Sequence, residues 1–226
     1  MLYLLDTANA EQIKKAFDLY PMSGVTTNPT IISKEKGNFL DILKTTRNII
    51  GQDKILYVQA VSKKSDEIVK EAEYLSKTIG GKLSIKIPVI PEGIKAIKIL
   101  KKEDIKTTAT TIFTPQQALI AAEAGASFVA PYVNRLDNIS GDGVGTVAQI
   151  VELFNLNGLD TKVLAASFKN VQQVHEVALA GAQAVTVSAE IMDNLVSHPL
   201  TDWSVEKFIK DWEGVYGKGE LTYDVK

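Results

Sequence analysis

The sequence predicts a (β/α)8 barrel, and three observations support this fold class. Eight short β-rich runs alternate with segments of helical period from one end of the chain to the other. Such alternation is typical of a parallel sheet, and eight units favour a closed barrel over an open sheet. The alternative, a doubly wound sheet, usually has a glycine-rich first turn, and no G-x-G-x-x-G occurs in the 226 residues.

The expected elements run through the whole chain without a linker, so we predict one domain over residues 1–226. The eight expected strands are Leu2–Asp6, Gly24–Asn28, Lys54–Val61, Leu83–Val89, Ile105–Phe113, Phe128–Asn134, Thr161–Phe168 and Ala184–Ser188. Helical segments between them include Asp66–Ile79, Pro91–Lys102, Pro115–Ala124, Val144–Leu156 and Val171–Ala180. Thr7 or Asn9 is expected to cap the first helix, and Pro115 suits the first position of a helix.

Residues 201–217 are predicted to form an extra C-terminal helix that a ring of eight helices does not need. It follows a short helical stretch, Glu190–Val196, and carries three aromatic residues, Trp203, Phe208 and Trp212. Exposed aromatic surface usually marks an interface, so we expect this helix to pack on a neighbouring subunit of a homo-oligomer. The alternative is that it covers its own barrel. The tail, Gly217–Lys226, is expected to be frayed or loosely docked.

Composition excludes several classes of protein. Hydrophobic residues make up 45%, enough for a sizeable core, and the net charge of −2 implies no basic face for nucleic acid. There is no cysteine, so disulfides and thiolate catalysis are excluded. The first residues lack the basic start of a signal peptide, and no apolar run approaches the about 18 residues needed to span a membrane. We expect a cytoplasmic protein that binds neither nucleic acid nor membrane.

Lys86 is the most informative single residue. In the expected strand Leu83–Val89, apolar side chains alternate with Ser84, Lys86 and Pro88, which would point into the barrel. A lysine in a strand usually extends to water or pairs with a carboxylate. Here both neighbours are apolar, and a buried lysine has a lowered pKa. A neutral amine attacks carbonyl groups to form imines, so Lys86 is a candidate for Schiff-base catalysis.

Polar residues recur near the carboxyl ends of the expected strands, in one phase of the alternation. Any one of them could be a satisfied core group or a cap. Their number is typical of the active site of a barrel, which lies at the carboxyl ends of the strands. They are Asp6, Thr26, Asn28, Gln59, Thr108, Thr110, Tyr132, Asn134, Ser167, Thr186 and Ser188, with Arg135 just beyond.

The two histidines do not extend this set. His175 lies in a helical segment and His198 in a loop before a proline, and neither is at a strand end. There is no H-x-x-H, no H-E-x-x-H and no acidic cluster, so we expect no metal site and no cofactor.

Five motifs resemble those of the small transaldolase/fructose-6-phosphate aldolase family. The resemblance extends from Leu2 to about Gly217 and rests on LDTAN (Leu5–Asn9), GVTTNPT (Gly24–Thr30), KIPV (Lys86–Val89), APYVNR (Ala130–Arg135) and AASFK (Ala165–Lys169). It implies a class I aldolase barrel in which Lys86 is the imine-forming lysine. It also implies sugar-phosphate substrates and an assembly of pentameric rings stacked into a decamer.

Each candidate residue then has an expected role in that chemistry. Asp6 is the expected base, and Tyr132 with Gln59 and Thr110 would hold a water that moves protons to and from the imine carbon. Thr26, Asn28 and Ser188 would bind the donor ketone. Ser167 and Arg135 would bind the phosphate of the acceptor, and Lys169 either adds charge there or is merely solvated.

The resemblance also distinguishes two branches. Classical transaldolases resemble one another in having glutamate at the position of Gln59, phenylalanine at that of Tyr132 and asparagine at that of Thr108. This sequence departs at all three positions. Gln59 and Tyr132 together favour an aldolase that cleaves fructose 6-phosphate to dihydroxyacetone and glyceraldehyde 3-phosphate, whereas the position of Thr108 varies among relatives. The alternatives are a transaldolase that passes the same three-carbon unit to another aldose phosphate, and a phosphate-binding barrel without catalysis.

Overall fold

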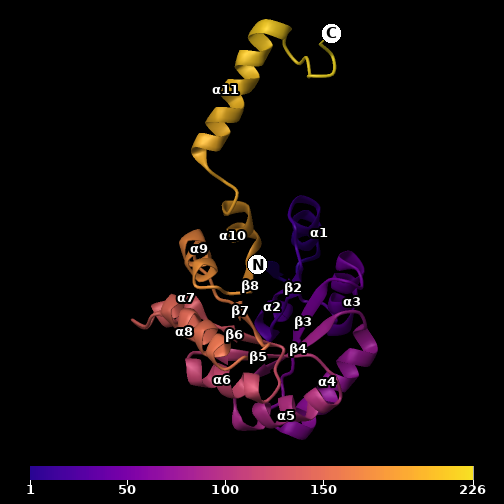
Figure 1. Ribbon diagram of the computed structural model, residues 1–226. Helices are drawn as coiled ribbons and strands as arrows, with labels where there is room; N and C mark the ends of the chain where they lie inside the picture. Colours follow the sequence, from indigo (N-terminus) through magenta and orange to yellow (C-terminus); the bar gives the residue numbers. More distant parts are fainter. Residues whose placement is uncertain (226) are drawn as a thin grey trace. The chain divides into compact units, whose positions relative to one another are not determined.

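The computed structural model describes residues 1–225, in which eight parallel strands close into a barrel in chain order (Figure 1). The predicted (β/α)8 fold is confirmed. The strands are β1 Leu2–Asp6, β2 Gly24–Thr26, β3 Ile55–Gln59, β4 Leu83–Pro88, β5 Thr107–Ile112, β6 Phe128–Pro131, β7 Lys162–Ala165 and β8 Ala184–Val187. β1 pairs with both β2 and β8, so no strand edge is left open.

Helices alternate with the strands along the chain. They are α1 Ala10–Leu19, α2 Pro29–Lys34, α3 Phe39–Ile50, α4 Ser65–Ile79, α5 Pro91–Lys102, α6 Pro115–Glu123, α7 Val133–Asp137, α8 Gly143–Leu156, α9 Val171–Leu179, α10 Ala189–Asn194 and α11 Pro199–Tyr216. Of the two predicted caps of the first helix, Asn9 is the one whose side chain accepts from the Gln12 amide. Pro115 follows the Thr114 cap of α6, as expected.

The barrel interior changes character from one end to the other. Towards the amino ends of the strands it is filled by an apolar cluster of Leu4, Tyr57, Phe128, Leu164 and Ala184. The next inward positions towards the carboxyl ends carry Asp6, Thr26, Lys86, Thr110 and Thr186. Burying polar groups is costly unless they are paired, so this half of the interior marks the region where chemistry is expected.

Seven of the eight expected strands end one to three residues earlier than the pattern suggested, and β2 and β6 are two that lead into a short helix. β2 stops at Thr26 because Asn28 caps α2 and Pro29 opens it. β6 stops at Pro131, since the Val133 and Asn134 amides donate to the carbonyls of Ala166 and Ser167 and the chain turns into α7. Asn134 and Arg135 are therefore helical, and the prediction that placed Asn134 on the sixth strand was wrong.

The chain forms two compact units, Met1–Met192 and Asp193–Lys226. The extra C-terminal helix is present as α11, and none of its residues is buried. Trp212 lies against Tyr216, with ring centroids 4.2 Å apart, and its Nε1 donates to the Glu220 carbonyl. Of the two states expected for the tail, frayed or loosely docked, the structure shows docking on α11 as far as Glu220; Lys226 lies outside the described residues. Within residues 1–225 no helix combines the length and apolar character required to cross a bilayer.

Candidate active site

Lys86 lies inside the barrel on β4, as its phase predicted. It is 6% exposed, and its Nζ donates to the Thr27 carbonyl at 3.0 Å. Burial lowers the pKa of Lys86 below its ordinary value of 10.5, and the nearby charge of Asp6 partly offsets that effect. A lowered pKa increases the fraction of neutral amine, which is the nucleophilic form.

Asp6, at the end of β1, is electrostatically coupled to Lys86. Burial raises the pKa of Asp6 above its ordinary value of 3.8, whereas Lys86, a hydrogen bond from Thr26 and the charge of Lys34 act in the opposite direction. A carboxyl group whose pKa is raised can accept and return protons at a higher pH than an ordinary aspartate. Lys86 and Asp6 therefore lie close enough at the carboxyl ends of the strands for each to influence the protonation of the other.

Thr26, which we expected to bind substrate, lies beside Asp6 in the barrel interior. Its side chain is fully buried, and its Oγ1 lies 2.7 Å from Asp6 Oδ1 and 2.5 Å from Thr186 Oγ1. The hydroxyl proton and one lone pair are thus used within the protein, and the predicted contact with substrate stays a prediction. Thr26 supports Asp6.

Tyr132 and Thr110 lie together, as the sequence predicted. The Tyr132 hydroxyl is 3.2 Å from Thr110 Oγ1, and the ring packs edge-on against Phe113. Gln59 is paired in register with Lys86, but no hydrogen bond of its amide to Tyr132 or Thr110 is found among the described residues; it lines a small cavity between β3 and α4 of about 220 Å³. The predicted water site is thus defined by the hydroxyls of Tyr132 and Thr110, and Gln59 lies on β3, next to the strand that carries Lys86.

Asn28 and Ser188, the other expected donors to the ketone, both serve as local caps. Asn28 Oδ1 accepts from the Ile31 amide at the start of α2, and Ser188 Oγ accepts from the Ile191 amide. The Asn28 amide nitrogen and the Ser188 hydroxyl proton are not used by these bonds. Each side chain is therefore held in place by its capping bond while it keeps a donor that this bond does not use.

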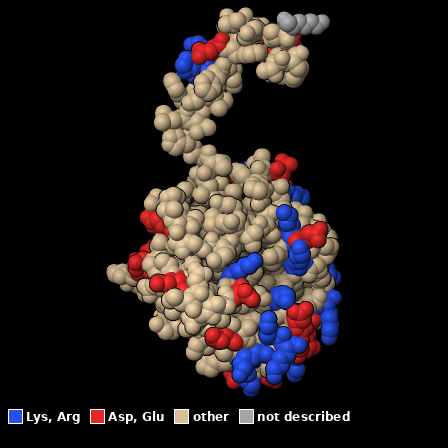
Figure 2. Space-filling model, viewed as in Figure 1, with Lys and Arg blue, Asp and Glu red and all other residues tan. Residues whose placement is uncertain are grey.

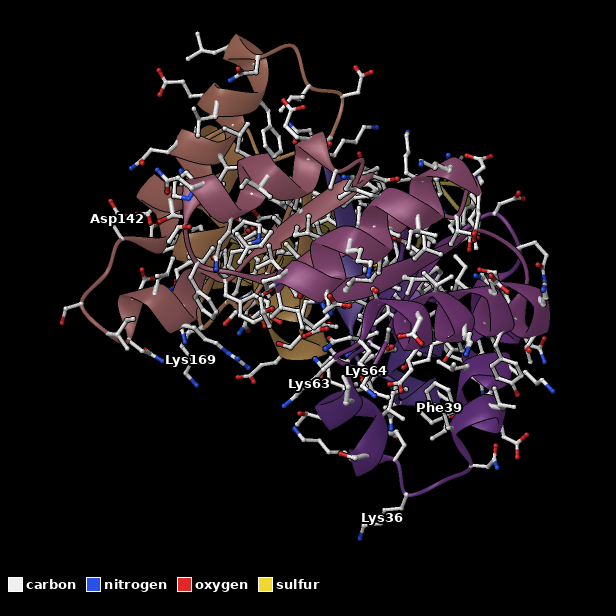
Figure 3. All side chains as sticks on the ribbon, turned by 90° about the horizontal axis from the view of Figure 1, so that it is seen from below. Lys36, Phe39, Lys63, Lys64, Asp142 and Lys169 are labelled. Atoms are coloured by element: carbon white, nitrogen blue, oxygen red, sulfur yellow. The ribbon has the colours of Figure 1, made fainter. Side chains whose placement is uncertain are left out.

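The expected phosphate-binding residues come from α7 and from the loop that follows β7. Arg135 lies on α7 with its guanidinium 4.8 Å from the centre of the Tyr132 ring. Ser167 follows β7 with a positive φ of 64°, a conformation that is uncommon outside glycine and is enriched at functional sites. Lys169 is exposed in the same loop, and Figure 3 shows it on the same side of the barrel as Lys63 and Lys64. These cations lie on the side of the barrel where the strands end.

A bulge in β5 shapes the site beside Thr110. The pairing of β5 with β6 shifts register between Ala109 and Ile112, and Thr111 has a φ of 58°. A β-branched residue in this region is strained, and bulges next to active sites re-aim side chains. The sequence analysis missed this feature because TTATTI is an ordinary strand sequence.

A cavity of about 910 Å³ opens at the opposite end of the barrel, where β4 to β7 begin. Its lining includes Lys82, Lys106 and Lys162 but no predicted site residue. Figure 2 looks onto this end and shows basic residues over α4 and α5 mixed with acidic ones. Active sites of this fold lie at the carboxyl ends of the strands, so we place the site around Lys86 despite the size of this cavity.

A buried lysine coupled to a carboxylate at the carboxyl end of a (β/α)8 barrel defines a Schiff-base aldolase class of enzyme. A model of the Transaldolase/Fructose-6-phosphate aldolase family matches residues 3–219. The chain is 45% identical over 215 residues to a protein of Dictyoglomus turgidum named "Probable transaldolase", covering 95% of this chain and 99% of that protein. It is 42% identical to one of Clostridioides difficile with the same name, covering 95% and 98%. The chain therefore belongs to the transaldolase/fructose-6-phosphate aldolase family.

Solved structures with low sequence identity share the barrel. A flavocytochrome b2 variant with sulfite bound has a TM-score of 0.61 at 13% identity, covering 83% of this chain and 56% of that one. A structure described as "Native KDPGal structure" has a TM-score of 0.58 at 14% identity, covering 83% and 82%. At such identities the likeness concerns the fold alone.

Replacing Arg135 by alanine is expected to weaken the binding of phosphorylated substrates about ten- to a hundredfold, because a charged hydrogen bond contributes roughly 1.5–3 kcal/mol. Unphosphorylated glyceraldehyde should be affected much less. The measurement is kcat/KM for glyceraldehyde and its 3-phosphate, with Lys162→Ala, at the other end of the barrel, as a control. Equal losses for both aldehydes would exclude Arg135 from phosphate binding.

Proposed function

We propose that this enzyme is a transaldolase, which moves a three-carbon ketol unit between sugar phosphates through a Schiff base on Lys86. The observation that carries the proposal is the buried Lys86 amine, held by the Thr27 carbonyl and coupled to Asp6. The choice of transfer over release is supported by relatives at 40–45% identity that are named probable transaldolases.

The chemistry follows from the groups at the site. Lys86 attacks the ketone of a ketose phosphate, and loss of water leaves an iminium. Asp6 removes the proton of the hydroxyl on the fourth carbon, the bond between the third and fourth carbons breaks, and an aldehyde leaves. The three-carbon unit stays on Lys86 as an enamine, which attacks the aldehyde of a second aldose phosphate in the reverse of these steps. Arg135, Ser167 and Lys169 bind the phosphate of the aldehyde.

A second candidate is the aldolase that the sequence favoured. One observation supports it, the Tyr132 hydroxyl beside Thr110. A phenol there can protonate the enamine and orient a water that releases dihydroxyacetone, whereas phenylalanine can do neither. The two candidates share every step up to the enamine and differ only in its fate.

A product assay with fructose 6-phosphate distinguishes the two candidates. For a transaldolase, adding erythrose 4-phosphate should accelerate consumption of fructose 6-phosphate strongly, with little free dihydroxyacetone. Tyr132→Phe should then change the transfer rate by less than about tenfold, but reduce any release of dihydroxyacetone by about a hundredfold or more. Rapid release of dihydroxyacetone without an acceptor would instead establish the aldolase.

We also propose that the enzyme is a homo-oligomer in the cytoplasm, with the pentameric rings and decamer that the resemblance implies. Support for assembly comes from α11, where large apolar side chains such as Trp203, Phe208 and Ile209 are more than half exposed. In this proposal residues 1–226 still form a single domain, as we expected, and its last helix packs on a neighbouring subunit. Sugar-phosphate metabolism supports the cytoplasmic location.

Ending the chain at Pro199 is expected to lower the oligomeric mass measured by light scattering. The double variant Trp203→Glu/Phe208→Glu should do the same in the full chain, because charges replace apolar contact surface. Lys210→Glu, on the same helix, serves as a control for added negative charge. A truncated protein that keeps the full mass would contradict a role for α11 in assembly.

A further inference from the structure

Two threonine hydroxyls meet beneath Asp6 from strands on either side of β1. Thr26 on β2 donates to Asp6 Oδ1 at 2.7 Å, and its oxygen lies 2.5 Å from the hydroxyl oxygen of Thr186 on β8. β1 pairs with both strands, with Asp6 opposite Thr26 and Leu4 opposite Thr186. The three polar groups therefore form a short chain across the inner face of β1.

The direction of this chain follows from proton counting. An ionised carboxylate only accepts hydrogen bonds, and a hydroxyl has one proton. Because Thr26 donates its one hydroxyl proton in the hydrogen bond to Asp6, the hydrogen bond between the two threonines must be donated by Thr186. Thr26 is fully buried and Thr186 is 4% exposed, so bulk water does not compete for these positions. With Asp6 ionised, the order of donation is Thr186 to Thr26 to Asp6.

Packing alone gives no reason for a hydroxyl at Thr186. All four residues of β8, AVTV, are buried, and its other three side chains are apolar. Valine has the shape of threonine and would avoid the cost of burying a hydroxyl. The polar group is therefore best explained by the chain that ends on Asp6.

We propose that Thr186 is a positioning residue. By donating a hydrogen bond to Thr26, it keeps the Thr26 hydroxyl oriented as a donor to Asp6, and this hydrogen bond favours the ionised carboxylate that the reaction needs. The role in catalysis rests on the proposed function, in which Asp6 is the base. Two charges also lower the pKa of Asp6, those of Lys86 on β4 and Lys34 on α2. The hydrogen-bond chain from Thr186 on β8 acts in the same direction. Hydrogen-bonded groups in a row polarise one another, so losing the far donor weakens the near bond by roughly 10–30%.

The test is the pKa of Asp6, measured by carbon-13 NMR of its carboxyl group in the full-length enzyme. We expect Thr186→Val to raise it by about 0.2–0.6 unit and Thr26→Val by about one to two units. The double variant should match Thr26→Val, because the outer donor acts only through Thr26. Thr186→Ser should restore the wild-type value. The control is Thr107→Val, which removes a buried hydroxyl without a partner on β5 and should leave Asp6 unchanged.

The acid limb of the kcat/KM profile is the second readout. If Asp6 is the base, Thr186→Val should move this limb to higher pH by the same amount as the pKa. A pKa that shifts while the limb stays supports the chain but refutes Asp6 as the base. An unchanged pKa of Asp6 in Thr186→Val, an equal shift in Thr107→Val, or no recovery in Thr186→Ser would each overturn the proposal.

Discussion

Replacing Lys86 by methionine is expected to lower kcat/KM by roughly four to six orders of magnitude, because no other group at the site can form the imine. Methionine has a similar length and no charge, so the barrel should still fold. The free energy of unfolding should rise rather than fall. Burial lowers the pKa of Lys86, which means that folding disfavours the protonated amine.

The pH dependence of that stability gain has a definite sign. The protonated amine destabilises the folded state most at a pH below its folded pKa, and this cost disappears as the pH rises towards 10.5. The gain from Lys86→Met should therefore be larger at pH 7 than at pH 10. Urea unfolding at the two pH values measures it.

Covalent trapping identifies the lysine directly. Borohydride in the presence of dihydroxyacetone should inactivate the wild-type enzyme and add the reduced three-carbon unit to the peptide that contains Lys86. Lys82→Met, an exposed lysine just before β4, is the matched control and should be trapped as readily as the wild type. A label on another lysine, or activity in Lys86→Met, would refute the assignment.

Replacing Asp6 by asparagine is expected to lower kcat about a hundred- to ten-thousandfold, the usual contribution of a general base. Asparagine can still accept the hydrogen bond from Thr26 but cannot take up a proton. Since burial raises the pKa of Asp6, wild-type activity should fall on the acid side at a pH above the ordinary range of aspartate, as the base becomes protonated. The asparagine variant should lack this limb.

Two comparisons make that experiment decisive. Asp53→Asn changes an exposed carboxylate in a loop and should leave both kcat and its pH profile unchanged. Borohydride trapping should still label Lys86 in Asp6→Asn, since the amine remains. An Asp6→Asn enzyme with the wild-type acid limb would show that another group is the base.

Local patterns in the sequence were sufficient to predict the barrel and the inward direction of the key side chains. The period of two along Leu83–Val89 placed Lys86 inside, and the same alternation placed Asp6, Thr110 and Thr26 on the inner face. Boundaries were less certain where a cap or a turn interrupts a strand. Asn28 and Arg135 follow strands in sequence but belong to the starts of short helices, a difference that depends on hydrogen bonds to neighbouring chain segments.

Contacts between distant strands were not predictable from the sequence. For Thr26, alternation predicted that the side chain points into the barrel. It did not predict how deep the side chain lies or which group it contacts. The partner, Thr186, is 160 residues away in the chain. The acceptor of the Lys86 amine is a backbone carbonyl, that of Thr27, which no residue type can reveal. The strained Thr111 likewise results from the register between β5 and β6.

By itself, the sequence determined the order of strands and helices, the inward phase of Lys86 and Asp6 and, through its motifs, the family. Those properties depend on the period of each element and on the identity of residues close together in the chain. The tertiary structure alone decided which polar groups share a proton and which of them remain free for substrate. Closure of the barrel sets these features, because it brings β8 against β1 and fixes the register of every strand on its neighbours.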